Sequence, residues 1–184
     1  MCLTSCPDKD SNSTLEGLKA LKAYRICYSW HVVELVQVDD ATFNGQIVTT
    51  NEVLAMFSNH PKPLHKSIPI PAETVKALMD SLKLQGIETL SAFNGMTSDT
   101  LPNGVIAMTL GVDGTTMMTE VASPDGYRFV SFWEPEHKRI HPQVVSAQAA
   151  YDIIHHLKSA LNLDQVFLDF QRSVPEGTMF LSGP

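Results

Sequence analysis

The strongest constraint on the fold is a run of β-rich segments in the second half of the chain, separated by short turns. Asp113-Gly114 stands between segments 105–112 and 115–123. Pro124-Asp125-Gly126 then separates 115–123 from 127–133. Glycine after aspartate suits the positive φ angles of tight hairpin turns. Because turns this short join only antiparallel strands, the pattern predicts hairpins rather than strand–helix–strand crossovers.

Segment 127–133 (YRFVSFW) is the best candidate strand in the chain. It carries apolar side chains at both odd and even positions, which is typical of a strand that is covered on both faces. We therefore predict that it is a central strand and that Phe129 and Trp133 lie in or against the core. On this expectation, Phe129→Ala should lower the free energy of unfolding by about 3–5 kcal/mol.

The first half of the chain also contains β-rich segments. Residues 24–30 alternate between apolar and polar side chains, as in a half-buried strand. Segment 32–38 (VVELVQV) is β-rich as well, Asp39-Asp40 marks a turn, and 42–50 can return as a hairpin partner. By contrast, 91–104 contains several turn dipeptides and predicts a long irregular connection.

Two amphipathic helices are predicted. Pro71 suits a first helical turn, and Gly86 ends this segment. The second helix runs from Pro142 to about Leu161. The apolar positions that share one face are Val75, Leu78, Met79 and Leu82 in the first helix, and Val145, Ala149, Ala150, Ile153, Ile154, Leu157 and Leu161 in the second. Residues 14–23 could add a short helix, while 165–170 and 178–181 predict a closing strand or docked tail.

The predicted fold class is α+β, an antiparallel sheet of hairpins with two amphipathic helices packed on one face. A length of 184 residues fits one domain, which we place at 14–184. Residues 1–13 have no periodic apolar face and end in the polar stretch PDKDSNS, so they predict a flexible N-terminal tether. We expect a chain that starts at Ser13 to fold as well as the whole chain.

Composition excludes several classes of protein. The 13 Lys and Arg against 20 Asp and Glu give a net charge of −7, which would repel phosphates, so nucleic acid is not an expected partner. No apolar run reaches about 18 residues, so the expected contact with a membrane is limited to a possible lipid anchor. The sequence has no glycine-rich nucleotide loop, nucleophile elbow or Cys-x-x-Cys pair, and no cofactor is expected.

The three cysteines are Cys2, Cys6 and Cys27, and their odd number argues against a disulfide framework. The sequence therefore predicts that Cys27 is a buried free thiol. Cys27 and His31 would lie about 13 Å apart along one strand, too far for a nucleophile and its base. After removal of Met1, Cys2 could act as nucleophile and base together, but the polar stretch that follows argues against this.

Histidines and aromatic residues supply the other candidates. His137 and His141 are four residues apart, so a helix could bring both to one metal ion, although an exposed loop between Pro135 and Pro142 is the alternative. The pair lacks the intervening Glu of a metalloprotease motif. His155 is predicted on the surface of the last helix. An aromatic set could form a ligand platform or simply belong to the core: Tyr24, Tyr28, Trp30, Tyr127, Phe129 and Trp133.

Two resemblances bear on location. Leu3-Thr4-Ser5-Cys6 resembles the lipobox of bacterial lipoproteins, which implies that Cys6 carries lipid and begins the mature chain, with a reading frame that starts upstream of Met1. Roughly half of the chain also resembles small bacterial α+β domains of unknown function that often follow lipoprotein signals. The features that carry this second resemblance are the return at Gly45, the Pro-led helix, the Asp-Gly and Pro-Asp-Gly turns, and Trp133-Glu134-Pro135 before a closing helix. It brings no catalytic residues.

These observations give three functional hypotheses. The first is a non-enzymatic domain of the bacterial cell envelope, anchored through Cys6, that binds another protein or a small ligand. The second is a cytoplasmic acidic protein of the inhibitor or immunity type, because a charge of −7 suits a basic partner and speeds association. The third is a hydrolase that uses Cys2 or a metal site at His137 and His141.

Overall fold

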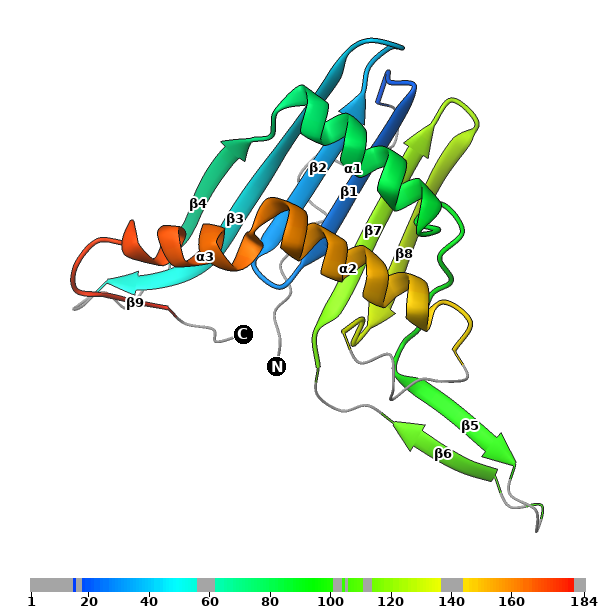
Figure 1. The fold of residues 1–184 in the computed structure, drawn as a ribbon. Coiled ribbons are helices and arrows are strands. Elements are labelled where there is room, and N and C mark those ends of the chain that lie inside the picture. Colours follow the sequence, from blue (N-terminus) through cyan, green and yellow to red (C-terminus); the bar gives the residue numbers. More distant parts are fainter. Residues whose placement is uncertain are drawn as a thin grey trace.

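The computed structural model describes residues 15, 18–55, 62–100, 104, 106–110, 114–136 and 144–180. Over these residues the chain forms a seven-stranded antiparallel sheet, a separate two-stranded sheet and three helices (Figure 1). The predicted α+β class is confirmed. The elements in chain order are β1 Lys22–Tyr28, β2 His31–Gln37, β3 Phe43–Ala55, β4 Lys62–Pro69, α1 Ala72–Leu84, β5 Met96–Thr100, β6 Ile106–Leu110, β7 Thr116–Ser123, β8 Gly126–Trp133, α2 Ala147–Leu161, α3 Leu163–Arg172 and β9 Thr178–Phe180.

The main sheet is built from two groups of hairpins. Strands β1 to β4 form a meander in which each strand pairs antiparallel with the next, and β7 and β8 form a further hairpin. The two groups join where β1 pairs with β7, so the strand order is β4-β3-β2-β1-β7-β8. Strand β9 pairs with the end of β3. The prediction of hairpins rather than crossovers is therefore confirmed.

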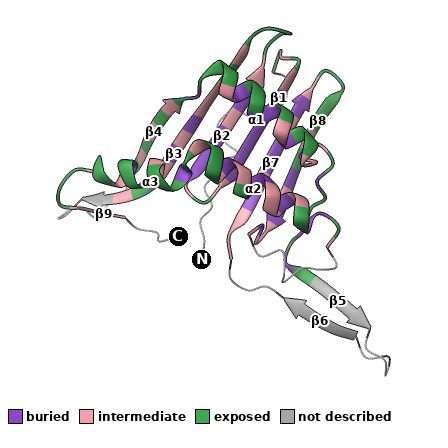
Figure 2. Cartoon of the chain, viewed as in Figure 1, coloured by how far each residue is buried: buried purple, intermediate pink, exposed green. Residues whose placement is uncertain are grey.

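The helices lie on one face of this sheet, and the core fills the space between (Figures 1 and 2). Helix α1 approaches β3 closely at Gly45, where a Cβ atom would come within 2.6 Å of Val75 Cγ2. A residue without a side chain is therefore required at this contact. The largest fully buried side chains are Tyr24, Ile26, Leu35, Leu78, Leu82, Ile87, Leu90, Met117, Phe132, Ile153, Ile154 and Phe170.

The structure adds a third helix to the two that were predicted. Residues 165–170 belong to α3, so the expectation of a strand or tail there is wrong, whereas 178–180 does form a strand. Asn162 separates α2 from α3 by adopting left-handed backbone angles, with φ 49° and ψ 49°. Asparagine tolerates this conformation better than most residues. Leu163, Val166 and Phe170 then follow the helical period and face the sheet.

Strand β8 is an edge strand of the sheet and not a central one. Val130 and Phe132 are buried under the helices, but Phe129 faces the other way and is 50% exposed, so its predicted burial is wrong. The apolar residues on both faces were misleading because only one of those faces is covered by helices. Trp133 is half-buried and packs against Phe93, with ring centroids 6.3 Å apart, as predicted for a residue against the core.

Two other predictions for connecting segments are corrected. Part of the expected irregular segment 91–104 is strand β5, which pairs with β6 in a hairpin that projects from the main sheet (Figure 1). Residues 18–21 are not helical, and β1 already begins at Lys22, so the short helix proposed for 14–23 does not extend over these residues. The predicted strands 105–112, 115–123 and 127–133 correspond to β6, β7 and β8.

The face of the sheet away from the helices carries a chain of polar contacts. Arg25 Nε lies 2.8 Å from Glu34 Oε1, and Arg25 Nη1 lies 3.0 Å from Glu120 Oε1. On one side, Gln46 donates to Glu34 and accepts from Ser67; on the other, the Tyr127 hydroxyl donates to Glu120. These six residues come from β4, β3, β2, β1, β7 and β8, so the polar chain crosses every strand of the main path. Leu15 is buried beside it and donates its backbone N–H to Glu120.

Candidate functional site

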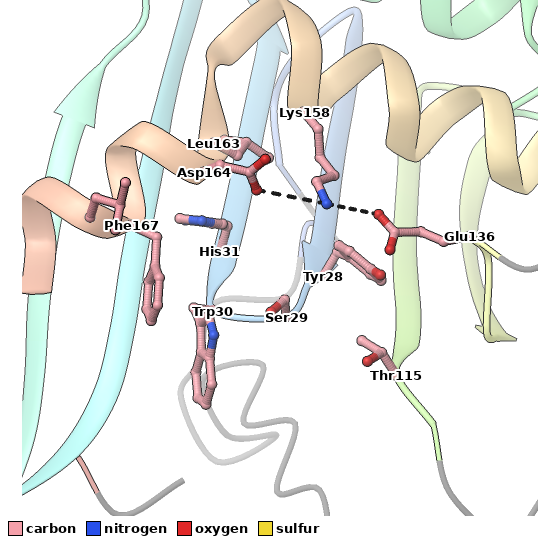
Figure 3. A pocket seen from close by; sticks show the side chains of 11 residues that line it. Tyr28, Ser29, Trp30, His31, Thr115, Glu136, Lys158, Leu163, Asp164 and Phe167 are labelled. Carbon is pink, nitrogen blue, oxygen red and sulfur yellow. Dashed lines mark hydrogen bonds and ion pairs between the residues drawn. The ribbon is translucent and has the colours of Figure 1, made fainter. Parts of the chain in front are cut away.

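A hollow of about 420 Å³ lies where the β1–β2 turn meets the junction between α2 and α3 (Figure 3). Its lining comes from four parts of the chain: the turn, the start of β7, the segment after β8, and the two helices. The lining residues are Tyr28, Ser29, Trp30, His31, Thr115, Glu136, Lys158, Leu163, Asp164, Phe167 and Leu168.

The β1–β2 hairpin sets the floor of this hollow. Tyr28 and His31 are register partners across the hairpin, so both side chains project toward the helices. Ser29 and Trp30 form the two-residue turn between them, and Ser29 has a positive φ of 53°. Such turns need this backbone conformation to match the twist of the two strands.

One wall of the hollow is aromatic. The rings of Trp30 and Phe167 stack with centroids 5.6 Å apart and planes only 7° from parallel. His31 meets Phe167 edge-on at 6.2 Å. Because Phe167 stands on α3, the left-handed break at Asn162 that starts α3 also places this wall. The wall offers flat apolar surface beside polar groups.

A charged bridge crosses the opposite side (Figure 3). Lys158 Nζ lies 2.9 Å from Glu136 Oε1 and 3.7 Å from Asp164 Oδ1. The hydrogen bond to Glu136 raises the pKa of Lys158, which is therefore an ammonium group at neutral pH. About a third of the Lys158 and Glu136 side chains is exposed, and the Asp164 side chain is 81% exposed. The bridge thus presents both hydrogen-bond donors and acceptors to solvent.

The two titratable groups on the floor are held in their neutral forms. Burial, followed by the nearby Glu136 carboxylate, raises the pKa of Tyr28 far above its ordinary value. Burial lowers the pKa of His31 to about 4, although a hydrogen bond with the Leu163 backbone opposes that shift. His31 Nδ1 also lies 3.0 Å from Thr49 Oγ1. At neutral pH both side chains are therefore suited to hydrogen bonding rather than to proton transfer.

A second hollow of about 680 Å³ adjoins the first. The two share Glu136, Lys158 and Asp164, so the charged bridge lies between them. Tyr151 and His155 supply the aromatic surface of the second hollow, with ring centroids 5.3 Å apart and planes 14° from parallel. Its remaining lining residues are Ser159 and Asn162.

Most predicted site residues lie outside the described residues. This is the case for Cys2 and Cys6, and for His137 and His141, whose metal site stays a prediction. In the part of the chain that the structure describes, no three His, Cys, Asp or Glu side chains are grouped as a metal site requires. No helix of the described part is long and apolar enough to cross a membrane.

The prediction for Cys27 is wrong. Cys27 is disulfide-bonded, and is therefore not the free thiol that an odd number of cysteines suggested. Its side chain is buried, but on the other face of the sheet from His31: its register partner is Val32, the neighbour of His31 in β2. The two were correctly judged not to form a catalytic pair. Neighbouring residues of a strand point to opposite faces, so the sheet itself lies between the Cys27 and His31 side chains. The sequence had instead suggested a separation by distance along one strand.

The sequence indicated only some of the residues that line the first hollow. Tyr28 and Trp30 were considered as a ligand platform, and His155 is exposed as predicted. Lys158 and Asp164 were missed because they are ordinary surface charges in the sequence. The available signal was the alternation along 24–30, which places Tyr28 and Trp30 on one face, whereas in the structure β1 ends at Tyr28 and Trp30 belongs to the turn that follows.

Comparison with known proteins supplies no relative, since no protein-family model and no curated protein matches this chain. The fold and the paired hollows therefore define the molecule only as an α+β domain with a groove at one end of its sheet.

Proposed function

We propose that this protein is a non-enzymatic binding domain of the bacterial cell envelope and that its ligand occupies the groove formed by the two hollows. The observation that carries the proposal is the make-up of the first hollow. It combines a stacked aromatic wall with a Lys158 bridge between two carboxylates, while Tyr28 and His31 stay neutral. Apolar surface with a few fixed polar groups is the usual composition of a small-molecule site.

The disulfide of Cys27 supports a location outside the cytoplasm. Disulfides persist in oxidising compartments, such as the bacterial periplasm, and are rare in reducing cytoplasm. This favours the envelope hypothesis over the cytoplasmic inhibitor. An acidic surface that attracts basic partners would serve in either compartment, so the net charge does not separate the two hypotheses.

Lipidation of Cys6 is a separate proposal, and the disulfide provides a test of it. The chain has no cysteines other than Cys2 and Cys6 that could pair with Cys27. Maturation at Cys6 would remove Cys2 and convert the Cys6 thiol to a thioether. A lipidated mature chain would therefore hold Cys27 as a free thiol. Intact mass and thiol counting on protein from the native membrane fraction distinguish the two forms.

Binding in the groove is tested with a library of small polar and aromatic compounds, followed by ligand-observed NMR. Hits are compared between the wild type, Lys158→Ala and the matched control Lys76→Ala, which changes an exposed lysine on α1. We expect hits that the wild type and the Lys76 variant share and that the Lys158 variant loses. Hits that are insensitive to Lys158, Trp30 and Phe167 substitutions, or conversion of a hit into products, would overturn the proposal.

A further inference from the structure

The groove has a repeated design that points to the class of its ligand. Each hollow contains one nearly parallel aromatic pair, Trp30–Phe167 in the first and Tyr151–His155 in the second. Between these pairs lies the Lys158 bridge with its two carboxylates. We propose, on the basis of the binding function above, that the groove takes a short oligosaccharide whose sugar rings rest on the two aromatic pairs.

The aromatic pairs match the apolar faces of sugar rings. A pyranose ring presents a face of C–H bonds, and the electron-rich face of an aromatic ring attracts such weakly positive groups. Trp30 is half-buried and Phe167 supports one side of it, which holds the indole in place. His155 is exposed on α2 and stacks on Tyr151, one turn earlier in the same helix.

The Lys158 bridge offers hydrogen-bond partners for the hydroxyl groups around the edge of the same sugar rings. Sugar hydroxyls both donate and accept hydrogen bonds, and they need both kinds of partner. Lys158 donates, while Glu136 and Asp164 accept. Asp164 is suited to a ligand because its contact with Lys158 is long, at 3.7 Å, and its side chain is mostly exposed. Hydrogen bonds to such charged groups are stronger than those between neutral groups.

Charge and topology disfavour other ligand classes. One ammonium and two carboxylates leave the bridge with a net negative charge, which opposes phosphates and other anions. An extended peptide usually binds by adding a strand to a sheet edge. The floor of this groove is formed by β1 and β2, which are interior strands with neighbours on both sides, so their backbone groups are already paired. The volumes of the two hollows lie within the ~300–1,000 Å³ typical of small-ligand sites.

The test is calorimetric titration of the full chain with cellotriose, maltotriose and tri-N-acetylchitotriose, each compared with its monosaccharide and with trialanine. We expect at least one trisaccharide to bind about tenfold or more tightly than its monosaccharide, because it occupies both hollows. Trp30→Ala should abolish that binding. His155→Ala, which removes the second aromatic pair, should lower trisaccharide affinity about tenfold.

Phe129→Ala, on the opposite face of the sheet, is the matched control and should bind like the wild type. Thermal melts confirm that each variant is folded. If no trisaccharide binds while library compounds still bind in a Lys158-dependent way, the saccharide proposal fails and the binding function stands. The saccharide proposal also fails if trialanine binds more tightly than every trisaccharide. It fails as well if neither Trp30→Ala nor His155→Ala changes trisaccharide binding. If no compound of any class depends on the groove, both proposals fail.

Discussion

Arg25 and Glu120 face each other across β1 and β7, and their side chains form an ion pair of 3.0 Å on the face of the sheet away from the helices. Both side chains are about 10% exposed. Arg25 also pairs with Glu34, so one guanidinium group serves two carboxylates in the middle of the sheet.

Removal of this arginine should destabilise the protein strongly. Arg25→Met leaves the carboxylates of Glu34 and Glu120, on the strands either side of β1, without their shared cation, and loss of one partner of a buried ion pair costs about 3–5 kcal/mol. Urea unfolding measures the change. Arg172→Met is the control, because its ion pair with Asp169 is exposed and should contribute less than about 1 kcal/mol. Equal losses in the two variants would contradict the prediction.

Two phenylalanines of β8 should respond very differently to truncation. Phe132 is 1% exposed and packs in the core, so Phe132→Ala should cost about 3–5 kcal/mol. Phe129 is 50% exposed, so Phe129→Ala should cost less than about 1 kcal/mol. Chemical denaturation of the two variants in parallel checks both values. A larger loss at Phe129 than at Phe132 would mean that β8 presents its other face to the helices.

His31 should make stability fall as the pH falls from about 6.5 to about 4. In the folded protein burial lowers the pKa of His31 to about 4, whereas in the unfolded chain it is near 6.5. Between these values the unfolded chain binds a proton that the folded chain does not, and this favours unfolding. The contribution is fully present above pH 6.5, and its total loss by pH 4 is about 3 kcal/mol.

The free energy of unfolding of the wild type and of His31→Gln, measured between pH 7 and pH 4, separates the contribution of His31 from that of the carboxylates. The variant should lose less stability than the wild type over that range. His155→Ala, which changes an exposed histidine on α2, is measured alongside as the control variant. Parallel pH profiles for the wild type and His31→Gln would show that folding does not lower the pKa of His31.

The disulfide should be necessary for full stability. Peptide mapping under non-reducing conditions should link the Cys27 peptide to Cys2 or Cys6, and reduction or Cys27→Ser should cost about 2–4 kcal/mol. A chain that starts at Ser13 lacks both possible partners and should lose a similar amount, contrary to the dispensable tether that the sequence suggested. Quantitative alkylation of Cys27 in the native oxidised protein would contradict this expectation.

The hairpins and α1 could be predicted from the sequence because local signals determine them. Alternation along 24–30, the Pro-Asp-Gly turn and the stripe of Val75, Leu78 and Leu82 all depend on near neighbours. The position of β8 could not be predicted in this way. Whether a strand is central or at an edge depends on which strands pair far along the chain, and on which face the helices later cover.

The groove was even less accessible to sequence reasoning. Trp30 and Phe167 stack although 137 positions separate them, and Glu136 meets Lys158 only because α2 folds back over the sheet. Nothing in a single sequence marks Lys158 as different from other surface lysines. Cys27 illustrates a different limit: a cysteine count gives the number of possible pairs but not whether a pair forms.

The polar chain that runs from Ser67 to Tyr127 also restricts the positions at which the protein can accept an inserted residue. One extra residue within a strand would turn its following side chains to the opposite face, moving a charge such as Glu34 into the core and an apolar neighbour into its place. The same extra residue in a hairpin turn leaves every strand in register. A library of single-codon insertions should therefore yield folded protein mainly at the turns, and the gaps between tolerated sites should trace the strands of the sheet.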